Sequence, residues 1–230
     1  MSPPALALEL ALESSRREAS LALTDGTREV AAEVGPRAHA SGLLARLEEL
    51  LAEFGPAARA RPLPLARVYV GLGPGSYTGL RVGLATAQAL AHATGAELLG
   101  LGSFEALAFE RLAPGESAAV VFDGRAACFY HARYRRTQDD LIELEPLTTC
   151  DAASLRARLA GTGRVLGHAG LAEAAGLGAL AGLELECHAA PSARGLLTLA
   201  RRRRAQGRLA PAAALEPLYL RAFGERPANA

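Results

Sequence analysis

The stretch GLGPGSYTGLRVGLATAQALAHATG, from Gly71 to Gly95, joins a glycine-rich loop to a long helical pattern. The apolar run Arg67 to Gly71 precedes it and predicts a short strand, so the glycines occupy a strand-to-helix turn. The helix is predicted from Thr78 to Ala93, and its first turn presents unpaired N–H groups toward the loop. A strand, a loop and a helix in this order predict an α/β fold.

The loop is a candidate site for an anion or a nucleotide, because glycine lets a backbone approach a ligand closely. Its spacing matches neither common nucleotide-binding motif. The chain has no lysine for GxxxxGK[ST], and no GxGxxG is followed by an acid ~20 residues later. The loop is therefore interpreted either as an anion site or as a tight turn. The candidate binding residues are Gly73, Gly75, Ser76 and Thr78.

Two acids lie at the predicted ends of strands, Glu13 in the first half of the chain and Asp123 in the second. Together they would imitate a magnesium site next to the loop. Asp followed by Gly, as at Asp123-Gly124, is more commonly a turn former.

Small side chains make the helix after the loop narrow. Close packing inside its own lobe is one explanation, and a surface where a helix of another subunit docks is the other. The small residues are Gly83, Ala85, Thr86, Ala87, Ala89, Ala91 and Ala93.

Composition limits the function classes. The chain has 230 residues, is 50% hydrophobic and carries a net charge of +1, so no global field directs it to nucleic acid or a membrane. All 25 basic residues are arginine, which lowers the weight of any arginine cluster. The three scattered cysteines predict neither a disulfide framework nor a zinc site. Without a signal peptide or an apolar run of ~18 residues, we expect a cytoplasmic protein and no membrane contact.

The order of patterns predicts two α/β lobes, residues 1–110 and 111–230, whose last segment is free to pack back on the first lobe. The first lobe reads as a hairpin, a third strand at Arg28–Val34, and strands alternating with helices. The second begins with a strand, turn and strand around Asp123-Gly124. Its predicted helices are 152–159, a weak glycine-rich one at 171–183, and 192–206.

The segment GPGSYTGLRVGLATAQALA resembles GPGSFTGLRIGLA of the bacterial TsaB (YeaZ) family. Other segments follow in the family's order: LALESSRREASLAL resembles LAIDTS…SVAL, LLGLGSFEALA resembles LVGVSSLEALA, and FDGRAACFYHARY resembles IDARRGEVYAALY. The start of the helix near His39 and EPLYLR near the end also match. The resemblance covers essentially the whole chain, with Glu13 where the family usually has Asp.

This resemblance implies the actin-like, Hsp70-like ATPase (ASKHA) fold, with two similar lobes of mixed β-sheets flanked by helices. It implies a non-catalytic subunit required for N6-threonylcarbamoylation of adenosine 37 in tRNAs that decode ANN codons. The implied partners are a TsaD-like catalytic paralogue and a TsaE-like P-loop ATPase, with tRNA reached only through the complex. A homodimer is expected when the chain is alone.

The family's docking surface is built by its first two helices, here His39–Phe54 and Thr78–Ala93. A four-helix bundle with the partner follows from this. The candidate docking residues are His39, Leu43, Leu47, Arg81, Val82, Ala85, Thr86 and Ala89.

The catalytic relative holds a metal through HxxxH on one helix, which places both imidazoles on one face. The corresponding residues here, 103–107, read SFEAL and contain no histidine. The resemblance therefore implies no catalysis, no metal and no cofactor of its own, and leaves nucleotide binding at a subunit interface open.

Two alternatives stay open. One is a stand-alone ATP-dependent kinase or hydrolase that uses the loop Gly73–Ser76 with Glu13 and Asp123. The other is a tRNA-binding module that uses the run Arg201–Arg204. Four consecutive residues point around a whole helix, so this run is interpreted as a solvated helix end or as a phosphate contact.

Overall fold

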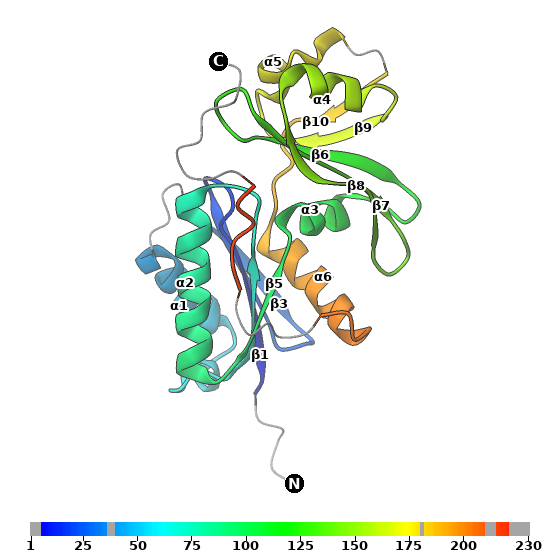
Figure 1. The fold of residues 1–230 in the computed structure, drawn as a ribbon. Helices are drawn as coiled ribbons and strands as arrows, with labels where there is room; N and C mark the ends of the chain where they lie inside the picture. Colours follow the sequence, from blue (N-terminus) through cyan, green and yellow to red (C-terminus); the bar gives the residue numbers. More distant parts are fainter. Residues whose placement is uncertain (1–5, 36–39, 180–181, 210–214, 221–230) are drawn as a thin grey trace. The chain divides into compact units, whose positions relative to one another are not determined.

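The computed structural model describes residues 6–35, 40–179, 182–209 and 215–220 (Figure 1). The chain divides into two compact units. The first comprises Met1–Ser103 and Pro191–Leu218, and the second comprises Phe104–Ala190 and Tyr219–Ala230. The sequence placed the boundary at residue 110, whereas the units divide at the first residue of α3 (Ser103–Arg111). Each unit is described by itself.

The sheet of the first unit has the strand order β3-β2-β1-β4-β5. The first three strands form an antiparallel meander, and β4 and β5 continue from β1 in parallel. The strands are β1 (Leu8–Glu13), β2 (Ala19–Thr24), β3 (Glu29–Val34), β4 (Leu65–Gly71) and β5 (Glu97–Leu101).

Two helices cover one face of this sheet and a third covers the other (Figure 1). Alternate residues of β1, such as Leu8 and Leu10, share a core with Leu43 and Leu47 of α1. Apolar residues at helical spacing form the buried stripe of α1, as the sequence predicted. The helices are α1 (Ala40–Glu53) and α2 (Tyr77–Thr94) on one face and α6 (Ala193–Ala205) on the other, with η1 (Pro56–Arg59) after α1.

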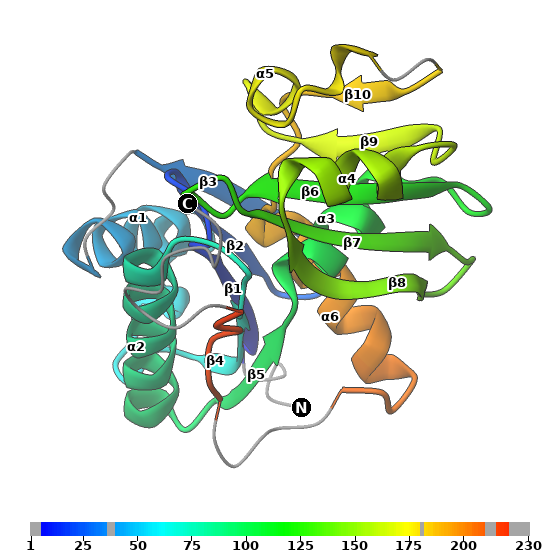
Figure 2. The same cartoon turned by 45° about the horizontal axis from the view of Figure 1, so that its top comes forward.

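The second unit repeats this topology. Its order is β10-β9-β6-β7-β8, again an antiparallel meander of three strands followed by two parallel strands (Figure 2). The strands are β6 (Ser117–Asp123), β7 (Phe129–Arg136), β8 (Leu141–Cys150), β9 (Arg164–Gly167) and β10 (Glu184–Glu186). The predicted fold class, two lobes with mixed sheets flanked by helices, is confirmed.

The helices of the second unit are shorter than those of the first. α4 (Ala152–Leu159) begins after Asp151, whose side chain accepts the Ser154 N–H. The weak helix predicted over residues 171–183 is wrong in extent. α5 (Leu171–Ala175) ends at Gly176, which has φ +63°, and a turn of 3₁₀ helix, η2 (Leu177–Ala179), follows.

Candidate functional site

The glycine loop lies at the carboxyl ends of three parallel strands of the first unit. Glu13 ends β1, Gly71 ends β4, and Ser103 comes just after β5. In open α/β sheets, ligands bind at this edge. The sequence therefore placed its candidate loop at the edge where a ligand site is expected.

The loop is closed by hydrogen bonds to its own chain. The Gly73 N–H donates to Ser103 Oγ at 3.1 Å, and the Ser103 N–H donates back to the Gly73 carbonyl at 2.9 Å. The Ser76 N–H donates to the Ser15 carbonyl at 2.7 Å. Ser76 also caps α2, because its Oγ accepts the Gly79 N–H at 3.3 Å. Several donors that an anion would need are thus already bound within the unit, while the Thr78 side chain is exposed.

Glycines repeat every four residues along the loop and α2, and all face the turn after β1. A Cβ on any of them would lie 2.0–2.2 Å from an atom of Glu13, Ser14 or Ser15. The turn is therefore seated directly on the loop and helix, and glycine is needed for this approach. Anion binding stays a prediction. The four glycines are Gly71, Gly75, Gly79 and Gly83.

The Glu13 carboxyl is buried inside this contact, with 1% of the residue exposed. Its Oε1 accepts the Ser15 N–H at 2.7 Å, and its Oε2 makes no hydrogen bond to a described residue. Burial raises the pKa of the Glu13 carboxyl, and hydrogen bonding to Ser15 offsets only part of this effect. The Glu13 carboxyl is therefore enclosed by protein.

Asp123 occupies the matching position in the second unit, at the end of β6, and is exposed. Its Oδ1 accepts the Arg125 N–H at 2.6 Å, and its own N–H donates to His168 Nε2 at 3.2 Å. Arg125, Ala126 and Ala127 follow with φ of 69°, 51° and 57°. Asp123 thus forms a turn, and its pairing with Glu13 in one site stays a prediction because the acids belong to different units.

A groove lies on the outer surface of α1 and α2 and has a volume of about 500 Å³. Leu44 of α1 is 44% exposed there. Side chains that line it are apolar apart from Arg81 and Thr86, and Thr86 is buried at 6% exposure. The lining residues are Ala40, Leu44, Arg81, Val82, Ala85, Thr86, Ala89 and Leu90.

Some small residues of α2 pack inside the unit, and others lie on the surface where a helix of another subunit was expected to dock. Gly83 faces Ser14 and Ala87 is fully buried, so these two pack inside the unit. Ala85 and Ala89 are exposed and line the groove.

Five of the eight candidate docking residues line the groove, namely Arg81, Val82, Ala85, Thr86 and Ala89. Leu43 and Leu47 are 1% and 3% exposed and belong to the core, so they support α1 and present no surface. His39 lies outside the described residues. Leu44 was missed, although its spacing of four from Ala40 indicates a shared helix face.

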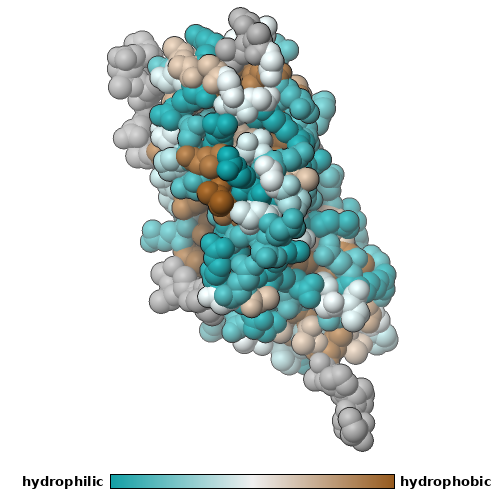
Figure 3. All heavy atoms as spheres, turned by 90° about the vertical axis from the view of Figure 1, so that its right-hand side faces the viewer, coloured by the Kyte–Doolittle hydropathy of each residue, from teal (hydrophilic) through white to brown (hydrophobic). Residues whose placement is uncertain are grey.

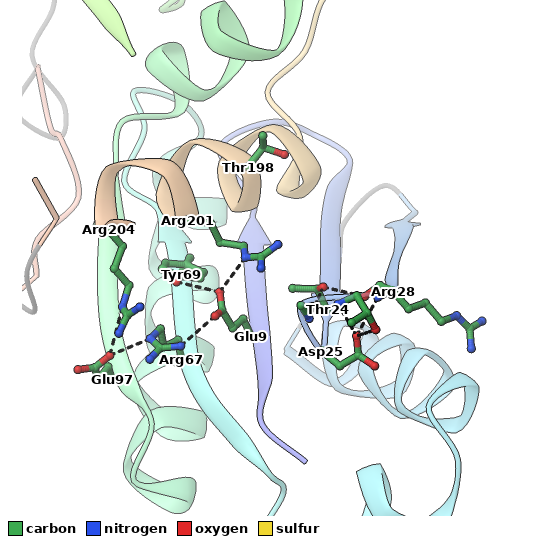
Figure 4. Close-up of polar contacts among 12 residues, drawn as sticks. Glu9, Thr24, Asp25, Arg28, Arg67, Tyr69, Glu97, Thr198, Arg201 and Arg204 are labelled. Atoms are coloured by element: carbon green, nitrogen blue, oxygen red, sulfur yellow. Dashed lines mark hydrogen bonds and ion pairs between the residues drawn. The ribbon is translucent and has the colours of Figure 1, made fainter. Parts of the chain in front are cut away.

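The arginine run lies on α6, and two of its members face the sheet (Figure 4). Arg201 Nε lies 3.4 Å from a carboxylate oxygen of Glu9, and Arg204 Nε lies 3.8 Å from one of Glu97. Arg67 pairs with both acids, at 2.9 Å and 3.0 Å. These two arginines bind the chain's own carboxylates, and a phosphate contact by the run stays a prediction.

Tyr69 completes this network from β4. Its hydroxyl donates to Glu9 Oε2 at 3.0 Å, and burial together with the Glu9 charge raises the pKa of the Tyr69 hydroxyl. Glu9 is a charged residue inside the otherwise apolar run of β1, and the sequence does not show which residues pair with it.

The face of the protein drawn in Figure 3 is mainly hydrophilic. Figure 3 shows one face on which apolar side chains gather only in small patches. Within the described residues, no group of three or more His, Cys, Asp or Glu side chains is arranged to hold a metal ion. Cys128, Cys150 and Cys187 are free thiols. None of the described helices has the length and hydropathy to cross a bilayer.

Two solved structures share the fold. YeaZ from Pseudomonas aeruginosa has a TM-score of 0.77 at 24% identity, with 93% of this chain and 100% of that chain covered. An uncharacterized protein described as similar to peptidase YeaZ from Pseudomonas aeruginosa has a TM-score of 0.74 at 26% identity, with 94% and 100% covered. The fold implied by the sequence resemblance is confirmed.

Comparisons of the amino-acid sequence also find TsaB among the relatives of this chain. Escherichia coli TsaB, a tRNA threonylcarbamoyladenosine biosynthesis protein, is 27% identical over 135 residues, 57% of each chain. An uncharacterized protein of Mycobacterium tuberculosis is 38% identical over 101 residues, 44% of each chain. These two matches span about half the length of each relative, and the resemblance to TsaB is confirmed. A family model described as TsaD, tRNA N6-adenosine threonylcarbamoyltransferase, matches residues 27–159. Since this match spans more than half of the 230 residues, the chain belongs to the TsaD family.

Proposed function

We propose that the chain is a non-catalytic subunit in the N6-threonylcarbamoylation of adenosine 37 in ANN-decoding tRNAs. In this role it binds a TsaD-type catalytic protein through the α1–α2 groove and activates it. A TsaE-like P-loop ATPase joins the pair, and tRNA is contacted through the complex. The similarity to TsaB and the TsaD family supports a role in threonylcarbamoyladenosine biosynthesis.

The single observation that carries the docking role is the groove itself. Helix α2 turns Ala85 and Ala89 outward beside the exposed Leu44, which leaves room for another helix to approach closely. Apolar grooves with a polar rim are common at protein interaction sites, and we propose that this groove is one of them. Without the partner, the same face is proposed to pair two copies of the chain.

The residues at the loop favour this role over catalysis. The segment that the sequence resemblance places at the metal-binding HxxxH of the catalytic relative begins at Ser103, whose hydroxyl accepts the Gly73 N–H. Glu13 is buried beneath the turn after β1, which packs closely against the four glycines of the loop and α2. Ser103 holds the loop to the chain itself, and Glu13 holds the turn beside it. We therefore propose that the loop shapes the start of α2 and that any nucleotide binds at a subunit interface.

The test replaces Ala85 with arginine in the full chain. The matched control is Ala153→Arg, an exposed alanine on α4 of the other unit. We expect Ala85→Arg to abolish co-purification with the TsaD-type protein of the same organism and to remove stimulation of tRNA modification. The control should behave as the wild-type chain. Wild-type binding and stimulation by Ala85→Arg would refute the docking role.

A further inference from the structure

One arginine side chain lines the groove and contacts a tyrosine of the same helix. Arg81 is the single charged side chain among the described residues that line it. Its Nη1 donates to the Tyr77 hydroxyl at 2.7 Å, one helical turn earlier on α2, and its guanidinium lies 5.3 Å from the centre of the Tyr77 ring. Within the described part of the chain, Arg81 makes no ion pair. A guanidinium has five N–H donors, and the contact with the Tyr77 hydroxyl uses one of them.

The carboxylates of the two helices are already used. Helix α2 contains no acidic residue, and α1 contains three. Glu48 pairs with Arg59 and Arg61, Glu49 pairs with Arg46, and Glu53 pairs with Arg28 at 2.7 Å. A second copy docked through α1 and α2 therefore offers Arg81 no unpaired carboxylate from either helix.

Docking places Arg81 against the other protein and removes water from around it. A guanidinium that loses water without gaining an anionic partner opposes association. One that meets a carboxylate forms a charge-assisted, two-pronged hydrogen bond. The Tyr77 contact fixes the guanidinium in advance, which lowers the entropy lost on binding.

We propose that Arg81 binds a carboxylate on the docked partner, and that this pair selects a different protein over a second copy of the chain. The occupant of the groove is then an apolar helix face that carries an aspartate or glutamate opposite Arg81. This inference rests on the docking role proposed above and adds the chemistry of the partner. Specificity arises because the wrong occupant leaves a charge unpaired.

The experiment measures two equilibria with the full chain. Titration calorimetry gives the Kd for the TsaD-type protein of the same organism at 50, 150 and 300 mM NaCl, and sedimentation equilibrium gives the Kd for self-association. The variants are Arg81→Gln and Tyr77→Phe. The matched control is Arg135→Gln, which removes an exposed arginine of β7 in the other unit.

We expect Arg81→Gln to raise the heteromeric Kd roughly tenfold to a hundredfold and to flatten its salt dependence, since a charge-assisted hydrogen bond is lost. Self-association should stay unchanged or tighten. Tyr77→Phe should raise the heteromeric Kd by a smaller factor with a wild-type salt dependence, because it removes the positioning contact and keeps the charge. Arg135→Gln should match the wild type.

The outcomes separate the two proposals. If the wild-type chain does not bind the TsaD-type protein, the docking role fails and this inference fails with it. If the wild-type chain binds and Arg81→Gln stays within twofold, only the inference is refuted. It is also refuted if Arg81→Gln weakens both equilibria equally, or if self-association of the wild-type chain is the tighter of the two.

Discussion

Replacing Gly75 with alanine tests whether the loop glycines serve packing or a ligand. A Cβ at this position would lie 2.1 Å from the Ser15 carbonyl oxygen and 2.8 Å from the Ser15 carbonyl carbon. These are backbone atoms, so rotation of a side chain does not relieve the clash. The Ser15 carbonyl also accepts the Ser76 N–H at 2.7 Å, and moving the turn breaks this bond. Overpacking of this kind costs about 1–3 kcal/mol, and the lost hydrogen bond adds about 1 kcal/mol.

The free energy of unfolding of the first unit should therefore fall by roughly 2–4 kcal/mol, which corresponds to a Tm lower by roughly 5–15 °C. Urea unfolding and thermal denaturation followed by circular dichroism, without ligand, measure the change. The matched control is Gly178→Ala, because Gly178 has no heavy atom within 4 Å of its Cβ position and no positive φ. Stability within about 0.5 kcal/mol of the wild type for Gly75→Ala would show that the turn is not held by this approach, since that is the range of a neutral surface change.

Two further changes address the buried acid and the left-handed turn. Burial raises the folded-state pKa of the Glu13 carboxyl above 4.5, so the stability gained from its protonated form is complete below pH 4.5 and is lost as the pH rises through the raised pKa. In urea unfolding, Glu13→Gln should therefore stabilise the chain more at pH 8 than at pH 5. An equal effect at both pH values would contradict the raised pKa of Glu13. Ala127 has φ +57°, so Ala127→Gly should raise the free energy of unfolding of the second unit by about 0.5–1 kcal/mol, and a loss of stability in the same assay would contradict the strain.

The sequence predicted the fold where the apolar residues kept a clear strand or helix periodicity. The leucines of β1 alternate and bury one face, and Leu43, Leu47 and Leu50 keep helical spacing along α1. The helical pattern was weakest over residues 171–183, where Gly176 ends α5 after five residues. The helix propensity of alanine argued for continuation there, and the left-handed glycine outweighed it. β10 has only three residues and carried no signal of its own.

The candidate site was predicted only in part. The spacing of residues shows which of them share a helix face, but it does not show which helix face is buried against the sheet. The sequence placed Val82, Ala85 and Ala89 together, and all three line the groove. It did not show that Leu47 points inward while Leu44 points outward, because both are leucines on the same helix. The contacts of Glu9 with Arg67 and Arg201 join parts of the chain far apart in sequence, and no local pattern reports them.

The repeated topology sharpens the choice between a catalyst and a docking subunit. Glu13 and Asp123 end the first strand of their respective sheets, so each unit places one acid at the equivalent edge. A metal-bound phosphate needs an acid that water and ligand can reach. To expose Glu13, the turn at Ser15 has to move away from Gly71 and Gly75, against which it packs. This movement breaks the hydrogen bond from the Ser76 N–H to the Ser15 carbonyl at the start of α2. The start of α2 leads into the groove that we propose as the docking surface, so exposing the acid in the first unit would disturb the helix on which the proposed docking depends. This conflict supports the proposed docking role of the first unit.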